Sequence, residues 1–441
     1  MHFSLDVLRA RKGDCLMLHF GTEKDPHLVL IDGGPSKVYK PHLSPRLAQL
    51  HSSRGIDAEE PLPIDIVMVS HVDDDHIRGI LELTSNQLRK NPDLRLKVAS
   101  LWHNTFDDIL TKKPDELLSG FGAASFTASA APAALTHDIE LDEDFDEEEA
   151  HQTLDVLASI GQGRQLRDDR EALQKNSAGQ RQWKLNHKTG GGLILATDAP
   201  QRVELDGGLE ITIVGPMLPE LKALQEAHDK WLREQKEGAK KSPEEMLAAF
   251  VDKSVPNLSS IVVLAEMGGK SMLLTGDARG DKILEGLELT GLLGPGKTRH
   301  VNLLKVPHHG SSNNMATVFF KRLPADHYVF SGDGEHGNPE RETLEMLLEA
   351  RGADADYTIH LTYPLGTIDA DRQADWEKEQ AKEKARKKKN PATKKPVRED
   401  WSPRKHSLGA FFKDNPKMVR KLSIVEDGKP HLINLLEPVK L

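Results

Sequence analysis

The chain has 441 residues, a formal net charge of -10 and 37% hydrophobic residues, which is typical of a soluble protein with one large domain plus additions, or with two domains. No apolar run approaches the ~20 residues of a membrane span or resembles a signal peptide, and the single Cys15 excludes a disulfide framework and a thiolate zinc site. We therefore expect a cytoplasmic protein without membrane contact, whose overall acidity argues against nucleic acid binding across its whole surface.

Three short strands are predicted at the start of the chain, over residues 3–8, 15–20 and 28–32. The third strand ends at Asp32, which is followed by Gly33 and Gly34. Asp32 is either an ordinary turn residue or a carboxylate that orients metal-binding side chains from behind.

The β-branched run 64–69 predicts a buried strand that ends in Ser70-His71-Val72-Asp73-Asp74-Asp75-His76. Two imidazoles and three carboxylates packed so closely would repel or desolvate one another unless a cation neutralised them. Histidine nitrogen and aspartate oxygen are ligands for zinc or manganese. By spacing, His71 and Asp73 suit one ion, and Asp75 and His76 suit a second. The alternative is an acid-rich helix N-terminus with aspartate caps.

A strand over 97–102 closes on His103, and the strand pattern then breaks from about 105 to 190. Residues 138–149 carry nine acids in twelve positions. Such a run is typical of a solvated loop rather than a ligand cluster, although it could also contact a protein partner. We interpret 105–190 as an insertion on the domain.

Strand patterns return at 209–215, and a charged helical pair is predicted over about 217–252. Strands at 261–267, 271–275, 301–306 and 328–331 follow, and several of them end in Gly-rich turns with Asp or His. These strand-end residues are Asp277, His308, His309 and His336. Together with Asp32 and the loop from His71 to His76, five strand ends spread over 300 residues carry such side chains. This is hard to explain unless they converge, which favours a metal site.

The motifs Leu30-Ile-Asp-Gly-Gly34, Ser70-His-Val-Asp-Asp-Asp-His76, Leu274-Thr-Gly-Asp277 and Lys305-Val-Pro-His-His-Gly-Ser311 resemble, in this order, those of the metallo-β-lactamase fold. They are most similar to the metallohydrolase domain of ComEC/Rec2-type competence proteins. The stretch Arg11-Lys12-Gly13-Asp14-Cys15 also resembles that subfamily's opening strands. The resemblance covers about residues 3–370 apart from the insertion.

The resemblance implies a four-layer αββα sandwich with two divalent metal ions, Zn or Mn, at one edge. Asp277 would bridge the two ions, and His309 or His308 would complete the second site, with His309 preferred because it directly precedes Gly310. The family's third-motif histidine is Asn257 here, and Gly-His-Pro is replaced by Gly337-Asn338-Pro339 with His336 adjacent. Oxygen donors such as Asp73 and Asn257 shift the preference from zinc toward manganese.

The leading functional hypothesis is a dinuclear phosphodiesterase or nuclease acting on nucleic acid or nucleotides. Asp75 or Asp277 would orient the nucleophile, and Lys305, His309 or His336 would face the substrate or leaving group. His103, like Asp32, is expected behind the ligands. Two alternatives stay open: an acyl hydrolase of the same fold (β-lactamase, lactonase or thioesterase type), or a non-catalytic, metal-stabilised component that binds partners.

The end of the chain changes composition again. Residues 371–405 are predicted as a charged helical and basic linker, in which 382–405 carry eleven Lys or Arg against three acids. The rest of the chain sums to -18, since the whole carries -10. This segment is either a solvated linker or a contact for a nucleic acid or protein partner. Residues 406–441 are predicted to form a hairpin, with strands at 421–425 and 431–436, that packs on the hydrolase domain of 1–370.

Overall fold

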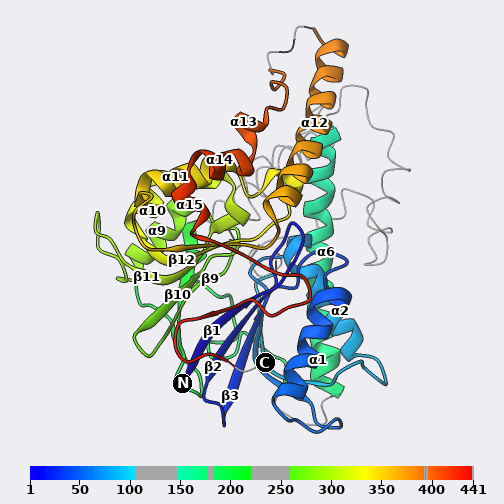
Figure 1. Ribbon diagram of the computed structural model, residues 1–441. Helices are drawn as coiled ribbons and strands as arrows, with labels where there is room; N and C mark the ends of the chain where they lie inside the picture. Colours follow the sequence, from blue (N-terminus) through cyan, green and yellow to red (C-terminus); the bar gives the residue numbers. More distant parts are fainter. Residues whose placement is uncertain (106–146, 177–181, 220–258, 392, 394–395, 440–441) are drawn as a thin grey trace.

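The computed structural model describes residues 1–105, 147–176, 182–219, 259–391, 393 and 396–439, and these form two mixed β-sheets with helices outside them (Figure 1). The strand order of the first sheet is β15-β1-β2-β3-β4-β5-β6. Its strands are β1 (His2–Val7), β2 (Leu16–Gly21), β3 (Pro26–Ile31), β4 (Leu62–Met68), β5 (Leu96–Trp102), β6 (Lys184–Leu185) and β15 (Leu432–Asn434).

The second sheet has the order β14-β13-β12-β11-β10-β9-β8-β7. Its strands are β7 (Arg202–Glu204), β8 (Glu210–Gly215), β9 (Val262–Met267), β10 (Lys270–Leu274), β11 (Val301–Lys305), β12 (Ala325–Phe330), β13 (Thr358–Leu361) and β14 (Leu422–Ile424).

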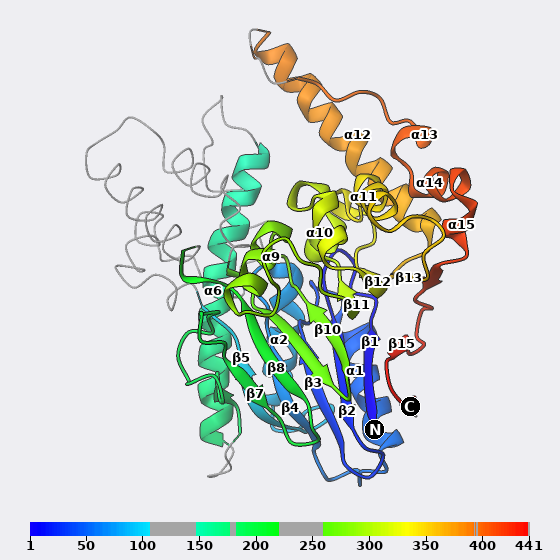
Figure 2. The same cartoon turned by 90° about the vertical axis from the view of Figure 1, so that its left-hand side faces the viewer.

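The helices cover the outer faces of the two sheets (Figure 2). On the first sheet these are α1 (Ser44–Ser53), α2 (Asp74–Gln87) and α6 (Glu147–Asn176). A short π-helix, η1 (Tyr39–Leu43), directly precedes α1. Over the second sheet and beyond it lie α9 (Gly280–Leu289), α10 (Thr317–Arg322), α11 (Arg341–Arg351), α12 (Leu365–Lys389), α13 (Pro403–His406), α14 (Leu408–Asp414) and α15 (Pro416–Val419). Three short 3-10 turns follow two strands: η4 (Pro307–Gly310) and η5 (Ser312–Asn314) come after β11, and η6 (Glu335–Gly337) comes after β12.

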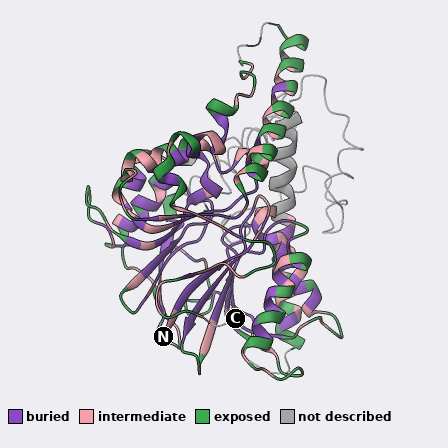
Figure 3. Cartoon of the chain, in the orientation of Figure 1, coloured by how far each residue is buried: buried purple, intermediate pink, exposed green. Residues whose placement is uncertain are grey.

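Three buried clusters explain this layering. Alternate residues of β1 and β8, such as Phe3, Leu5, Ile211 and Ile213, pack together between the sheets. The opposite faces pack on the helices: one cluster joins the first sheet to α1, α2 and α6, and another joins the second sheet to α9, α10, α11 and α14. Figure 3 shows the sheets buried and the outer helix surfaces exposed. The predicted α/β sandwich, with helices on both outer faces, is therefore present.

Parallel pairing brings strand ends to one edge. β3, β4 and β5 run parallel in the first sheet, and β10, β11, β12 and β13 run parallel in the second. The turns after these strands therefore lie at the carboxyl ends of their sheets, where ligand sites of open α/β sheets are found.

The predicted C-terminal hairpin is wrong. β14 pairs with β13 of the second sheet, whereas β15 pairs with β1 of the first, so the terminal segment contacts both sheets and its two strands do not pair with each other. The predicted boundary at 370/371 is also wrong, because it falls within α12.

The predicted insertion is partly integral to the fold. β6 extends the first sheet beside β5, and Leu166 and Leu173 of α6 are buried in the core under that sheet. Residues 106–146, with most of the acidic run, lie outside the described residues, as does the predicted helical pair beyond residue 219. None of the described helices has the length and apolar composition needed to cross a membrane.

Candidate metal centre

Side chains from several strand ends converge at one buried point. Their potential ligand atoms lie within 4.8 Å of one another in two overlapping groups that share His76. One group is Asp14, His76, Asp277 and His309, and the other is His71, Asp75 and His76. All are buried except Asp75, which is half-buried.

Asp277 lies at the centre of this cluster. Its Oδ1 is 3.3 Å from Nε2 of His76, and its Oδ2 is 3.3 Å from Nε2 of His309. Nε2 of His71 is 3.8 Å from the same Oδ2. The carboxylate therefore faces ligand candidates of both groups, as expected for a bridging residue. Because β10 and β4 belong to opposite sheets, only the packing of the sandwich brings Asp277 to the His71–His76 loop.

Asp32 lies behind His76 and sets its orientation. Nδ1 of His76 donates to Asp32 Oδ2 at 2.9 Å, which directs Nε2 at Asp277. Ser70 holds Asp32 in turn, since its backbone N–H and its hydroxyl both donate to that carboxylate at 2.7 Å. Nδ1 of His309 similarly contacts Oγ of Ser331 at 2.9 Å. These contacts fit the predicted role of Asp32 as an orienting carboxylate.

Sequence reasoning did not include Asp14 among the site residues. Its Oδ1 lies 3.6 Å from Nδ1 of His309, and its Oδ2 lies 2.5 Å from Nζ of Lys305. Gly13 makes this approach possible, because a Cβ there would lie 1.8 Å from the carbonyl oxygen of Asp75. The sequence did contain a signal for Asp14: the Gly13-Asp14 pair lies in the turn between two predicted strands, at the edge of the sheet where the other ligand candidates lie.

The cluster carries more negative charge than its protein partners neutralise. Burial opposes the ionised form of Asp14, yet the Lys305 ammonium and His309 hold its pKa below the usual range. Burial also disfavours a charged His309, but the carboxylate of Asp277 outweighs it and raises the pKa of His309 to about 10. The pKa of His76 is raised well above its usual value in the same way, against burial, chiefly by Asp277 and Asp32.

Three atoms of the cluster lack a hydrogen-bond partner although they are buried, namely Nε2 of His71, Oδ1 of Asp277 and Oδ1 of Asp14. Buried polar atoms normally have partners, so each such atom needs an explanation. Neutral imidazole and carboxylate facing one another without hydrogen bonds are the donor set that a divalent cation would coordinate. The described residues therefore include a cluster suited to hold metal.

The other predicted residues fall into different positions. Asp73 approaches the cluster through His71, with Oδ2 at 3.5 Å from Nε2, and is partly exposed. His308 lies 3.8 Å from Asp277 but is less buried than His309, which alone of the pair belongs to the converging group. His103 is buried and accepts a hydrogen bond from Arg167 at 3.0 Å, and it takes no part in the contacts among the ligand candidates described above. Asn257 lies outside the described residues.

The sequence predicted that Lys305 and His336 face the substrate or leaving group, and both lie in other surroundings. Lys305 is 1% exposed and its ammonium contacts Asp14, so it acts on the ligands rather than presenting charge to solvent. His336 is exposed at the rim, where its Nε2 lies 2.8 Å from Nζ of Lys12. The surrounding protein, which keeps part of the ring out of water, and the ammonium of Lys12 lower the pKa of His336.

The turns that carry these residues have unusual backbone conformations. Asp32, His308, His309 and His336 all have φ between 46° and 58°, in the left-handed region. A non-glycine residue there costs about 1–3 kcal/mol, and such residues cluster at functional sites. Four such residues lie in turns at the same edge of the sandwich. Their presence indicates that the placement of these side chains outweighs the local strain of the backbone.

No family model matches the chain. A stretch of 77 residues is 38% identical to part of the microtubule-associated protein futsch of Drosophila melanogaster, and the match covers 18% of this chain and 1% of that protein. The chain thus spans a very small part of that relative's length.

Proposed function

We propose that the chain is a two-metal hydrolase of the metallo-β-lactamase fold that cleaves a phosphodiester of nucleic acid or a nucleotide. The substrate class comes from the motif resemblance to ComEC/Rec2-type metallohydrolases. The metal chemistry is supported by the buried cluster of Asp and His side chains.

The charge of the cluster is the observation that carries the proposal. Five carboxylates lie in or beside it, those of Asp14, Asp32, Asp73, Asp75 and Asp277, and one ammonium, that of Lys305, contacts them. When the histidines are neutral, which is the form that binds a metal, this leaves four negative charges, which two divalent cations would balance. A buried, uncompensated charge of this size is costly.

The residues suited to hold the ions are the two converging groups, with Asp73 at the edge of the first. When bound, two divalent cations neutralise charge on phosphoryl oxygens and lower the pKa of water. Asp32 holds His76 in the tautomer that leaves Nε2 free to coordinate. Asp75 is half-buried and open to solvent on one side, which suits a carboxylate that orients a water molecule or a substrate.

The decisive experiment is elemental analysis of the purified protein, followed by Mn²⁺-supplemented digestion of single-stranded DNA, double-stranded DNA and bis(p-nitrophenyl) phosphate. A β-lactam, a lactone and a thioester serve as acyl substrates in parallel. We expect metal-dependent turnover of the phosphodiesters. Turnover of an acyl substrate alone would replace the proposal with acyl hydrolysis, and metal binding without turnover of any substrate would favour a metal-stabilised partner-binding role.

A further inference from the structure

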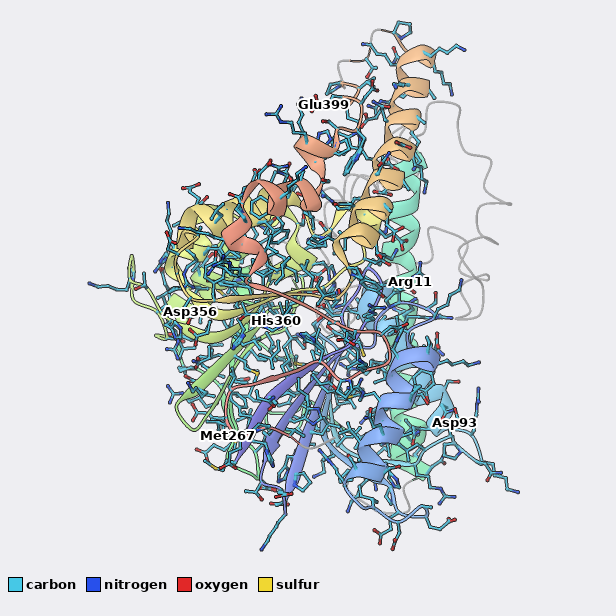
Figure 4. All side chains as sticks on the ribbon, in the orientation of Figure 1. Arg11, Asp93, Met267, Asp356, His360 and Glu399 are labelled. Carbon is cyan, nitrogen blue, oxygen red and sulfur yellow. The ribbon has the colours of Figure 1, made fainter. Side chains whose placement is uncertain are left out.

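Helix α12 and the segment that follows it form an arm that extends beyond the sandwich in both views (Figures 1 and 2). The returning segment is held against the helix. Trp376 donates to the carbonyl of Glu399 at 2.8 Å, Gln380 donates to that of Arg398 at 3.0 Å, and Arg398 pairs with Glu383 at 2.8 Å. Figure 4 shows Glu399 beside the helix. The described part of the basic linker is therefore an ordered structure.

The returning segment covers one face of α12 and leaves another exposed. Trp376, Gln380 and Glu383, three or four residues apart, face the returning segment. On the exposed side lie Lys378, Lys388 and Lys389, with the small residues Ala381 and Ala385 between them. None of these three lysines is in an ion pair within the described part of the chain. By contrast, Glu383, Glu399 and Asp400 each have a cationic partner on the arm.

The base of the arm rests on the rim of the candidate metal centre. Arg372 of α12 donates to the carbonyl of Gly337 at 2.9 Å, and a Cβ on Gly334 would lie 3.0 Å from Cβ of Asp371. This turn carries His336, which contacts Lys12, two residues before Asp14. The helix side with Asp371 therefore faces the rim.

The same side of the helix bears two of the exposed lysines, and Lys388 lies about a quarter turn around the helix from them. Lys378 and Lys389 follow Asp371 by seven and 18 residues, which are close to two and five full turns. At 1.5 Å per residue, Lys378 lies about 10 Å and Lys389 about 27 Å along the axis from Asp371. One face of α12 thus leads from the metal centre to the positive tip of the arm.

We propose that this lysine face of α12 binds the phosphate backbone of a nucleic acid whose scissile phosphodiester lies at the metal centre. The proposal rests on the proposed function and adds a length rule to it. Phosphates of one strand follow at about 3.4 Å along the axis of stacked, duplex-like nucleic acid, so such a strand starting at the rim reaches Lys378 after about three nucleotides and Lys389 after about eight, and an extended single strand needs fewer. Substrates too short to reach Lys388 and Lys389 at the tip of the arm gain no binding affinity from these two lysines.

The ordinary explanation for cations at 386–389 is that they stabilise the C-terminus of the helix. It predicts a loss of thermal stability on their removal and no dependence on substrate length. Lys378 separates the two explanations, because it lies in the middle of α12, where the helix dipole has little effect.

The test compares the full chain with the variant Lys378→Gln/Lys388→Gln/Lys389→Gln and with Lys378→Gln alone. The matched control is Lys321→Gln/Lys413→Gln/Lys417→Gln, which removes three exposed lysines from α10, α14 and α15. Single-stranded oligonucleotides of about 3, 6, 10 and 20 nucleotides are tested for hydrolysis and, with a fluorescent label, for binding at several salt concentrations.

We expect wild-type affinity to rise with length up to about eight nucleotides and then level off. The arm variant should bind the long oligonucleotides about tenfold or more weakly, and its slope of log K against log salt should fall by about 2, or 0.7 per phosphate contact. Turnover of bis(p-nitrophenyl) phosphate should not change, and affinity for the 3-mer, which reaches Lys378 at most, should change least. Lys378→Gln alone should show a smaller loss with unchanged thermal stability.

Equal losses in the arm and control variants, affinity independent of length, or a wild-type salt slope in the arm variant would each overturn the proposal. Lysine-dependent binding to phosphatidylserine vesicles without oligonucleotide binding would also overturn it, in favour of a membrane surface. Binding is read separately from hydrolysis, so failure of the proposed function appears as absent turnover with length-dependent binding intact.

Discussion

Two groups of histidines in this protein have opposite electrostatic character. In the candidate metal centre, carboxylates raise the pKa of His76 and His309. His327 and His360 of the second sheet and His431 of the segment before β15 form a relay, in which His360 is buried and the other two are half-buried. Nδ1 of His327 is 3.1 Å from Nε2 of His360, and Nδ1 of His360 is 2.9 Å from Nε2 of His431. Burial and the neighbouring His431 lower the pKa of His360 to about 2. Figure 4 labels this side chain.

The difference lies in what the rings face. In the relay, His360 contacts other imidazoles through both nitrogens, so three neutral rings satisfy one another and tie β12 and β13 to the segment before β15. In the metal centre, ring nitrogens face carboxylates, and several buried atoms have no partner. Buried histidines therefore indicate a cation only when carboxylates exceed the available positive charge.

Removal of the central carboxylate should have the largest effect. Asp277→Ala deletes the group that faces both His76 and His309, so bound metal and hydrolysis should fall by about 100-fold or more, beyond the 10–100-fold typical for an outer partner. Elemental analysis, turnover and far-UV circular dichroism measure metal, activity and fold. Asp75→Ala should behave alike; full activity in a metal-depleted variant would contradict the two-metal hypothesis.

Asp32→Asn tests the orienting carboxylate. Asparagine tolerates the positive φ of 56° at this position, so the turn should persist while the negative charge behind His76 is lost. Metal affinity should fall about 10–100-fold. The matched control is Asp65→Asn, which alters another carboxylate that contacts a histidine, His27 at 3.0 Å, outside the cluster. Competition with a chelator measures both, and equal losses would show that the effect is not specific to the site.

The relay should respond to pH instead of metal. The folded pKa of His360, about 2, lies below the unfolded value of about 6.5, so the unfolded chain binds the extra proton and stability falls as pH drops below about 6.5. This group should cost about 2 kcal/mol at about pH 5 relative to neutral pH. His360→Leu should be less stable at neutral pH but lose less on acidification, with unchanged metal content. Denaturant unfolding at several pH values measures this, and an unchanged pH dependence would contradict it.

The smallest effect is expected for metal preference. Asp73 offers oxygen where the metallo-β-lactamase motif that this loop resembles has a second imidazole, so wild type should be more active with Mn²⁺ than with Zn²⁺. Asp73→His should shift the activity ratio toward zinc by no more than about tenfold, or about 1.4 kcal/mol. Reconstitution of the metal-free protein with each ion measures the ratio. Equal wild-type activity with both ions would refute the ligand argument.

The sequence by itself predicted the strand ends and the ligand candidates, because strand periodicity and a change from apolar to ionisable residues are local signals. The run 64–69 and Ser70-His71 illustrate this, since β4 ends at Met68 and His71 follows it into the cluster. His309 was preferred over His308 from its position before Gly310, and the geometry agrees.

The tertiary structure alone decided which partner each chain segment meets. Asp14 enters the cluster because Gly13 lets its turn touch Asp75, 62 positions later in the chain. Lys305 turns inward to Asp14, a contact between residues 291 positions apart. The two terminal strands have similar local patterns, yet β14 and β15 join different sheets because the open edges of β13 and β1 offer unpaired backbone groups to each. Local sequence carries the propensity for a strand or turn, whereas pairing and burial depend on long-range packing, which no short pattern contains.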